Sequence, residues 1–255
     1  MIRPQLQQHR ARKVSALLQY ESGFIAKSSL IHLPQFDGIC SHCDFDTKQY
    51  SDSLFDAYNI DFPPLLQRAT DVRKADFLAG RITAQHAFHA LGLPKAPVPV
   101  GNHRSPVWPN TVFGSISHHK GSAYCLLMHR PAAAYGSAGI GIDAESIIDA
   151  ADVHSLSASI ARPAELDLVA LNFDKEALAL TVIFSAKESV FKVLYPAVAR
   201  YFDFLDVDVC AIDINHNALS LRLLRDLSPQ FLKGHIITVH WQLSAQTVLS
   251  WVGPS

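Results

Sequence analysis

The sequence lacks long apolar runs, has few cysteines and carries no excess of either charge. Without an apolar run of about 18 residues, we expect no transmembrane helix. The first residues, MIRPQLQQHRARKV, are polar and basic, and no apolar segment follows them, so a secretory signal is not expected either. Four cysteines in 255 residues do not form a disulfide scaffold. These features favour a cytoplasmic enzyme.

The balance of acidic and basic residues gives no reason to expect a partner that is attracted by the overall charge of the protein. The formal net charge is -1, so no overall field indicates nucleic acid as a ligand, and any anion site must be local. Hydrophobic residues make up 49% of the chain and charged residues 18%, which is typical of a globular protein. The length allows one large domain or two small ones.

The segment CSHC has the spacing of half a zinc site, in Cys40, His42 and Cys43. A structural zinc site needs four ligands, usually as two spaced pairs, and the other cysteines, Cys125 and Cys210, are isolated in strand-like segments. We therefore favour a loop with partly buried thiols over zinc or a thioredoxin-like motif. Whether Cys40 and Cys43 have any role stays open.

The first half of the chain predicts one strong helix and several strands. A short strand is expected over 28–33 and a short helix before Pro63–Pro64. Residues 71–94 have helical periodicity, and Gly92 and Pro94 end the helix. Strand-like segments follow at 111–117, 122–128 and 138–145, the first two joined by the turn-like HHKG. This pattern favours an antiparallel meander of three strands.

The second half predicts helices and then strands. A helix begins at Pro163, a residue that the first helical turn tolerates, and a longer one ends near Pro196. Four or five strands follow. The sequence therefore predicts an α+β fold of two pseudo-symmetric halves, 1–132 and 133–255, that meet along one seam. Each half is expected to be a small, mainly antiparallel sheet packed with a long helix.

Two carboxylates mark the segment GIGIDAE. In a strand, Gly141, Asp143 and Glu145 share one face, while Ile140, Ile142 and Ala144 face the core. The carboxylates lie roughly 6–7 Å apart at their Cα atoms, and a divalent cation such as Mg²⁺ would remove their repulsion. Gly141 would leave room on that face. The alternative is an acidic strand end that faces solvent.

Three charges interrupt the apolar run FSAKESVFKV: Lys187, Glu188 and Lys192. Glu188 and Lys192 are four residues apart and therefore neighbours on one helix face. Their charges either serve a site or form a helix-stabilising pair worth a few tenths of a kcal/mol. Lys187 is either a solvated flank or a contact for a protein partner.

Phosphate-binding groups appear in FGSISHHKG and in the helix of the first half. A serine hydroxyl, the His118 imidazole and the N–H groups of a turn suit a phosphate oxyanion, although a plain β-turn with a surface histidine is the alternative. Arg73 and Arg81 are separated by about 80° around their helix. They can therefore reach one ligand.

The ordered set SISH (115–118), IGIDAE (140–145) and FSAKESVFK (184–192) resembles the Sfp-type 4′-phosphopantetheinyl transferases, and more closely the enterobactin synthase component D branch. The helix over 72–93, the stretch HRSPVWP (103–109) and residues 43–69 are similar to the same branch. The motifs cover roughly residues 40–200. The chain departs from the pattern in a second histidine, His119, and in the small Ala144 between the carboxylates.

The resemblance implies transfer of the 4′-phosphopantetheine arm of coenzyme A (CoA) to a carrier-protein serine, with 3′,5′-ADP as the second product. It implies Mg²⁺, with Mn²⁺ as an alternative, held by Asp143, Glu145 and Glu188. Catalytic roles fall to Glu188 as general base, to Lys192 and to His118. CoA-binding residues would be Arg73, Arg81, Arg104, Ser117, His118 and Lys192.

The implied partner is an apo acyl, peptidyl or aryl carrier protein, expected to dock near the Lys187 helix. The resemblance favours siderophore or other nonribosomal peptide pathways but leaves polyketide and fatty-acid carriers open. A monomer is expected. The alternatives are another Mg²⁺-dependent phosphoryl-transfer enzyme and an inactive homologue that binds CoA or a carrier.

Overall fold

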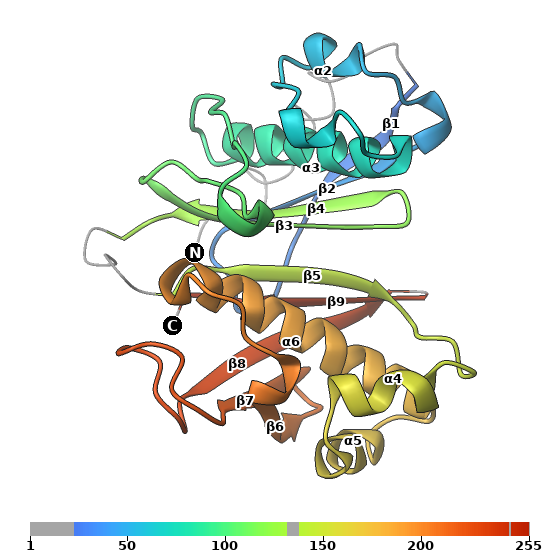
Figure 1. The fold of residues 1–255 in the computed structure, drawn as a ribbon, viewed down its shortest axis with the longest axis vertical. Helices are drawn as coiled ribbons and strands as arrows, with labels where there is room; N and C mark the ends of the chain where they lie inside the picture. Colours follow the sequence, from blue (N-terminus) through green and yellow to red (C-terminus); the bar gives the residue numbers. More distant parts are fainter. Residues whose placement is uncertain (1–22, 132–137, 245, 255) are drawn as a thin grey trace. The chain divides into compact units, whose positions relative to one another are not determined.

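The computed structural model describes residues 23–131, 138–244 and 246–254. The chain divides into two compact units, Met1–Ala132 and Ala133–Ser255, and we describe each unit by itself. Each unit contains an antiparallel sheet and a long helix that covers it (Figure 1). The predicted α+β class is therefore confirmed.

The first unit is a four-stranded sheet with one long helix. Its elements are β1 (Ile25–Ile31), β2 (Ile39–Phe45), η1 (Thr47–Gln49), α2 (Leu54–Ala57), η2 (Pro64–Leu66), α3 (Asp71–Ala90), η3 (Asn102–Arg104), β3 (Val112–His119) and β4 (Ser122–His129). The strands lie in the order β1-β2-β4-β3, and all neighbours are antiparallel. Helix α3 packs on β2, β3 and β4.

Local signals set the ends of α3. The hydroxyl of Thr70 accepts a hydrogen bond from the backbone N–H of Arg73 at 3.3 Å, which caps the first turn. Beyond the last turn, Gly92 has a φ of +79°, a backbone angle that glycine adopts at little cost. Between these ends, Leu78 and Ile82 are fully buried. The predicted helix is confirmed, two to four residues shorter at its end.

The β3–β4 connection differs from the predicted tetrapeptide turn. Both His118 and His119 belong to β3 and pair with Ala123 and Ser122. Only Lys120 and Gly121 form the turn, with φ angles of 41° and 81°. Two successive positive φ angles match the twist of the flanking strands, so the hairpin closes with two residues.

The CSHC segment forms part of β2 rather than the predicted loop. Cys40 and Cys43 are three residues apart and so point to opposite faces of the strand. Burial raises the pKa of each thiol to about 12, which keeps both protonated, whereas metals bind thiolate. The two side chains therefore pack as small apolar groups, and Cys43 also contacts the Thr83 hydroxyl at 3.0 Å.

The second unit is a five-stranded sheet with three helices. Its elements are β5 (Gly141–Ser146), α4 (Val153–Ile160), α5 (Pro163–Ala170), α6 (Glu176–Val198), η4 (Phe204–Asp206), β6 (Val207–Asp213), β7 (Ala218–Leu223), β8 (Ile236–Ser244) and β9 (Thr247–Val252). The strand order is β5-β9-β8-β7-β6, and all neighbours are antiparallel. Helix α6 packs on β5, β9 and β8.

Two features of the second unit correct the sequence analysis. Strand β5 pairs with β9, not with β4, so the three-strand meander is wrong. Periodicity identifies a strand but not its partner, which long-range packing selects. Helix α4 was also not predicted. Helix α6 continues past Pro196 to Val198 and ends at Ala199, which has a left-handed φ of 54°.

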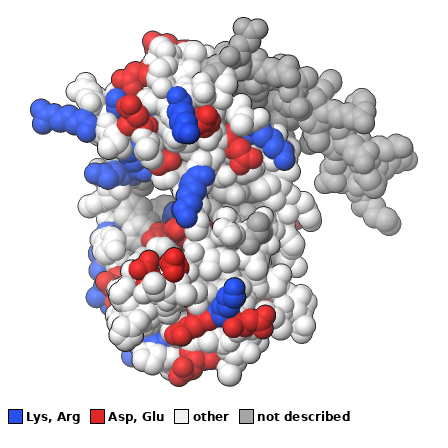
Figure 2. Space-filling model, turned by 90° about the vertical axis from the view of Figure 1, so that its right-hand side faces the viewer, with Lys and Arg blue, Asp and Glu red and all other residues white. Residues whose placement is uncertain are grey.

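Acidic and basic side chains are interspersed on the face drawn in Figure 2. This face therefore offers no large surface of one charge, in keeping with the near-zero net charge of the chain. Within the described residues, none of the helices combines the length and the apolar character that a membrane crossing requires.

Candidate active site

Four predicted cationic or titratable side chains line one small pocket of the first unit. The pocket has a volume of about 110 Å³ and includes Arg73 and Arg81 from α3, Arg104 from η3 and His118 from β3. Arg73 and Arg81 reach it because they lie on neighbouring faces of α3, and His118 reaches it because it shares a strand face with Ile116, which also lines the pocket. Three arginines around one small volume suit an anion.

Arg81 is held by two contacts within its own unit. Its Nε donates a hydrogen bond to the carbonyl oxygen of Val98 at 2.6 Å, and its guanidinium lies 4.2 Å from the ring centroid of Phe77. Burial lowers the pKa of Arg81 to about 10, so the group is poorly hydrated but still charged at neutral pH. A guanidinium in such a setting gains more from an anionic ligand than an exposed one does.

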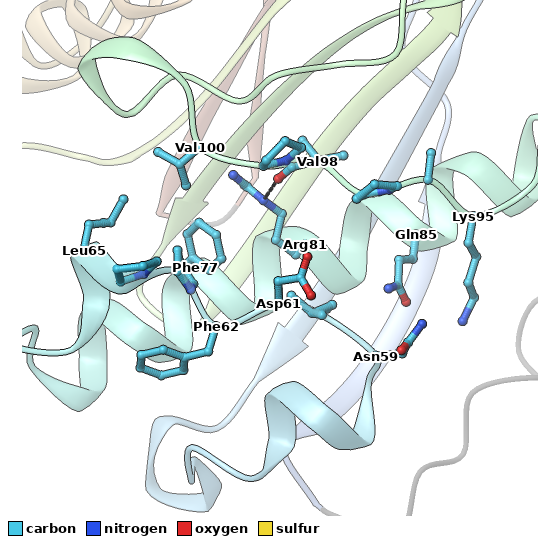
Figure 3. Close-up of a pocket in the computed structure, with 16 residues that line it drawn as sticks. Asn59, Asp61, Phe62, Leu65, Phe77, Arg81, Gln85, Lys95, Val98 and Val100 are labelled. Carbon is cyan, nitrogen blue, oxygen red and sulfur yellow. Dashed lines mark hydrogen bonds between the residues drawn. The ribbon is translucent and has the colours of Figure 1, made fainter.

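A larger pocket of about 560 Å³ adjoins the small one (Figure 3). Figure 3 shows Arg81 between Phe77 and the segment that carries Val98 and Val100. Both pockets are lined by Leu65, Phe77, Arg81 and Val100. The larger pocket contains several prolines and aromatic side chains. It therefore offers an apolar surface directly beside a cationic one, an arrangement that suits a ligand with a flat ring and a phosphate.

Ser117 does not reach this pocket. Side chains alternate along β3, so Ser117 lies on the face opposite His118, where it is 6% exposed. Asp76, by contrast, lines the small pocket and was not singled out in the sequence. The signal that could have found it is its spacing, because Asp76 follows Arg73 by three residues and so shares its helix face.

In the second unit, β5 and α6 approach closely at Gly141. A Cβ atom at this position would overlap the carbonyl oxygen of Ser189 and lie 3.0 Å from Val193. The space that the sequence analysis assigned to a ligand is therefore filled by α6. Asp143 lies two residues along the same strand face and so faces the helix.

Lys192 of α6 meets the end of β5. Its Nζ donates to Asp143 Oδ1 at 2.8 Å and to the carbonyl oxygen of Ile142 at 2.9 Å. The side chain of Asp143 is 4% exposed and that of Lys192 is 24% exposed. A buried carboxylate costs little only when a cation or donor accompanies it. Lys192 is therefore the counter-charge of Asp143 in this structure.

Glu188 lies one turn before Lys192 on α6 and is half-buried. Burial raises the pKa of its carboxyl, Asp143 raises it further, and Lys192 lowers it. The two carboxylates are thus close enough to interact, with one ammonium group near both. A carboxyl whose pKa is raised accepts a proton more readily at neutral pH, which suits a general base.

The carboxylates of Asp143, Glu145 and Glu188 form a donor set made only of oxygen, the set that Mg²⁺ prefers. Asp143 and Glu145 share the strand face that α6 covers. Among the residues that the structure describes, no three His, Cys, Asp or Glu side chains are gathered closely enough to hold a metal ion. The donors thus fit a hard cation by their chemistry and not by their present arrangement, in which the ammonium of Lys192 neutralises Asp143.

Lys187 is 2% exposed. It is therefore neither the solvated flank nor the surface contact for a protein partner that the sequence suggested. Its Nζ lies 2.7 Å from Glu165 Oε1 and donates to the carbonyl oxygens of Ile160 and Phe204 at 2.9 and 3.1 Å. Burial lowers the pKa of Lys187 and Glu165 raises it. The side chain fastens α6 to α4, α5 and η4 and is almost completely shielded from solvent.

Two family models match the chain. The 4′-phosphopantetheinyl transferase N-terminal domain matches residues 63–128, and the 4′-phosphopantetheinyl transferase superfamily matches residues 139–247. The first range contains Arg73, Arg81, Arg104 and His118, and the second contains the three carboxylates and Lys192.

Individual relatives agree with the family models. The chain is 34% identical to enterobactin synthase component D of Escherichia coli O157:H7 over 185 residues, which are 72% of this chain and 79% of the relative. It is 31% identical to the 4′-phosphopantetheinyl transferase Svp of Streptomyces mobaraensis, over 69% of this chain and 70% of that protein. It is 29% identical to the 4′-phosphopantetheinyl transferase PptT of Mycobacterium tuberculosis, over 57% and 62%.

Proposed function

This chain belongs to the 4′-phosphopantetheinyl transferase superfamily, and from that premise we propose how its residues perform the reaction. The enzyme transfers the 4′-phosphopantetheine arm of CoA to a carrier protein. A serine hydroxyl of the carrier attacks the pyrophosphate phosphorus that bears the arm, and 3′,5′-ADP leaves. Such phosphoryl chemistry depends mainly on positioning and on neutralising charge.

The nucleotide half of CoA binds in the two adjoining pockets of the first unit. The single observation that carries this assignment is the convergence of Arg73, Arg81, Arg104 and His118 on one pocket. The 3′-phosphate enters this cationic pocket, and adenine lies in the larger pocket against Phe77. Arginine suits both, because it binds phosphate through two parallel hydrogen bonds and stacks on flat rings. Ser117 contributes only through the β3 backbone next to His118.

The second unit supplies the reacting groups. Glu188 accepts the proton of the carrier serine, helped by its raised pKa. Lys192 exchanges its contact with Asp143 for an oxygen of the pyrophosphate and neutralises the charge that develops there. The bound Mg²⁺ (or Mn²⁺) would be held by Asp143, Glu145 and Glu188. When bound, it supplies further positive charge at the pyrophosphate.

The remaining assignments follow the resemblance to the enterobactin branch. The carrier belongs to a siderophore or related peptide pathway, the enzyme is a monomer, and it acts in the cytoplasm. Support for the last point comes from the four cysteines, which are free thiols, as is usual in a reducing compartment.

A labelling assay tests the proposal. Apo carrier protein, a fluorescent CoA and Mg²⁺ are incubated with the wild type, with Glu188→Gln and with Lys192→Met. We expect labelling by the wild type, loss with EDTA, and a decrease of about 100-fold or more in each variant. Glu176→Gln is the matched control, since Glu176 is an exposed acid in the first turn of the same helix.

Two results would overturn the proposal. A protein that binds CoA but labels no peptidyl, aryl or acyl carrier would be an inactive binding homologue. A protein that cleaves the CoA pyrophosphate without a carrier would be a different metal-dependent phosphoryl enzyme.

A further inference from the structure

One acid lines the pocket that otherwise suits an anion. Among the residues that the structure describes, the charged and titratable side chains that line it are Arg73, Asp76 and Arg81 from α3, Arg104 from η3 and His118 from β3. On the neighbouring strand β4, His118 lies opposite Ala123, which adds no charge. A carboxylate repels phosphate, so Asp76 weakens the pocket for an anion unless it acts on one of the cationic groups.

The geometry identifies that group as His118. Arg73 Nη1 lies 3.0 Å from His118 Nε2, and Asp76 Oδ2 lies 3.7 Å from His118 Nδ1. A guanidinium can only donate hydrogen bonds, so Nε2 must accept and carries a lone pair. The ring proton therefore sits on Nδ1, on the side of Asp76.

This tautomer cannot bind phosphate as it stands. When the guanidinium of Arg73 donates to the phosphate instead of to His118, the lone pair on Nε2 would face a negatively charged oxygen. A proton that binds Nε2, from solvent or from the phosphate monoanion, makes the ring an imidazolium, which then donates to the phosphate. The carboxylate next to Nδ1 decides how readily this happens, because a nearby negative charge favours the protonated ring.

We infer that Asp76 is a positioning residue for His118: its carboxylate faces Nδ1 from 3.7 Å and stabilises the imidazolium that receives a phosphate of CoA. This rests on the proposed function, in which the pocket binds CoA. The side chains of Asp76 and His118 are 19% and 32% exposed, so solvent only partly screens their attraction. Burial raises the pKa of Asp76 and Arg73 lowers it. The carboxylate is thus poorly hydrated and benefits from a cationic neighbour.

The simpler role for Asp76 is structural. As a neighbour of Arg73 on one helix face, it could hold only the arginine, which would stabilise α3 by a few tenths of a kcal/mol. That role predicts no change in the titration of His118. The pH profile of CoA binding therefore separates the two roles.

The experiment compares the full-length wild type with Asp76→Asn and Asp76→Glu. The ring of His118 is titrated by NMR without ligand, with His118→Gln to assign its signal, and the KM for CoA is measured from pH 6 to pH 8.5. In Asp76→Asn the midpoint of His118 should fall by about one pH unit. The KM at pH 8 should then rise up to about tenfold, with a smaller change at pH 6, where the ring is protonated more easily. The effect should fall on KM rather than kcat, and Asp76→Glu should restore most of it.

Two outcomes separate this inference from the proposed function. If Asp76→Asn leaves the His118 midpoint unchanged, or raises the KM equally at both pH values, the inference is wrong and the role of Asp76 is structural. If His118→Gln binds CoA as tightly as the wild type, the pocket does not receive a CoA phosphate, and the proposed binding site itself is wrong.

Discussion

The two long helices use their charged residues in opposite ways. On α3, Arg73 and Arg81 line a pocket in which, within the described part of the chain, cationic groups outnumber acids and Asp76 is the one carboxylate. On α6, Lys187 and Lys192 each lie within 2.8 Å of a carboxylate of their own unit. The first helix therefore directs positive charge into a pocket, whereas the lysines of the second are paired with carboxylates inside their own unit. The predictions below test this contrast.

Lys187→Met should have the largest effect, on folding. It leaves the carboxylate of Glu165 buried without its cation, which lowers the free energy of unfolding by about 3–5 kcal/mol. Urea denaturation measures the change. Replacing both partners, as in Lys187→Met with Glu165→Gln, should cost less than the single change. A single variant within 1 kcal/mol of the wild type would contradict the internal role of this charge.

Gly141→Ala should separate β5 from α6. The new methyl group would overlap the carbonyl oxygen of Ser189, so we expect a loss of about 1–3 kcal/mol in unfolding free energy and a fall in transferase activity. Gly139→Ala is the matched control, because its Cβ would meet the carbonyl oxygen of Val193 at an ordinary 3.6 Å. Equal effects of the two variants on thermal melting would contradict the close approach of β5 and α6 at Gly141.

Arg81→Lys tests the helix that faces the ligand. Lysine has a single ammonium group. It therefore cannot keep the hydrogen bond to the Val98 carbonyl oxygen and also bind phosphate through two parallel hydrogen bonds. The KM for CoA should rise about tenfold, with a smaller effect on kcat and little effect on stability. 3′-Dephospho-CoA provides the check, since the variant should discriminate less than the wild type between it and CoA. Undiminished discrimination would place the 3′-phosphate elsewhere.

Glu188→Gln, which should abolish most labelling, should have the smallest effect on stability, a gain. Because burial raises the pKa of Glu188, the folded state holds this proton more tightly than the unfolded state does. Its contribution to stability is therefore present at low pH and lost as pH rises through the raised pKa. At pH 8 the variant should melt about 2–4 °C higher than the wild type. Below the pH range in which an ordinary carboxyl group titrates, the two proteins should melt at the same temperature. A lower melting temperature at pH 8 would show that Lys192 over-compensates the burial.

Long periodic segments were the most predictable parts of the fold. Helices α3 and α6 and the hairpin of β3 and β4 follow from apolar spacing, because that spacing reflects one buried face. The short segment Cys40–Cys43 was misread as a loop, since a few residues carry little periodicity. Strand β5 was recognised, but its partner β9 lies about 100 residues away, and nothing local selects it.

The candidate site was predictable as a set of residues but not as an arrangement. Asp143, Glu188 and Lys192 came from motif order, and Arg73 and Arg81 from helical spacing. His118 and Ser117 were expected to act together, yet strand alternation places them on opposite faces. Asp76 was not predicted, because the sequence does not show that it lies next to His118.

By itself the sequence determined the α+β class, the order of the motifs and which side chains could do chemistry, because these depend on local periodicity and residue type. The tertiary structure alone decided what each charge faces: Glu165 for Lys187, Asp143 for Lys192, and Arg73 and Asp76 for His118. Most of these partners come from elements distant in the chain. The strength of a charge pair depends on separation and burial, which only packing sets.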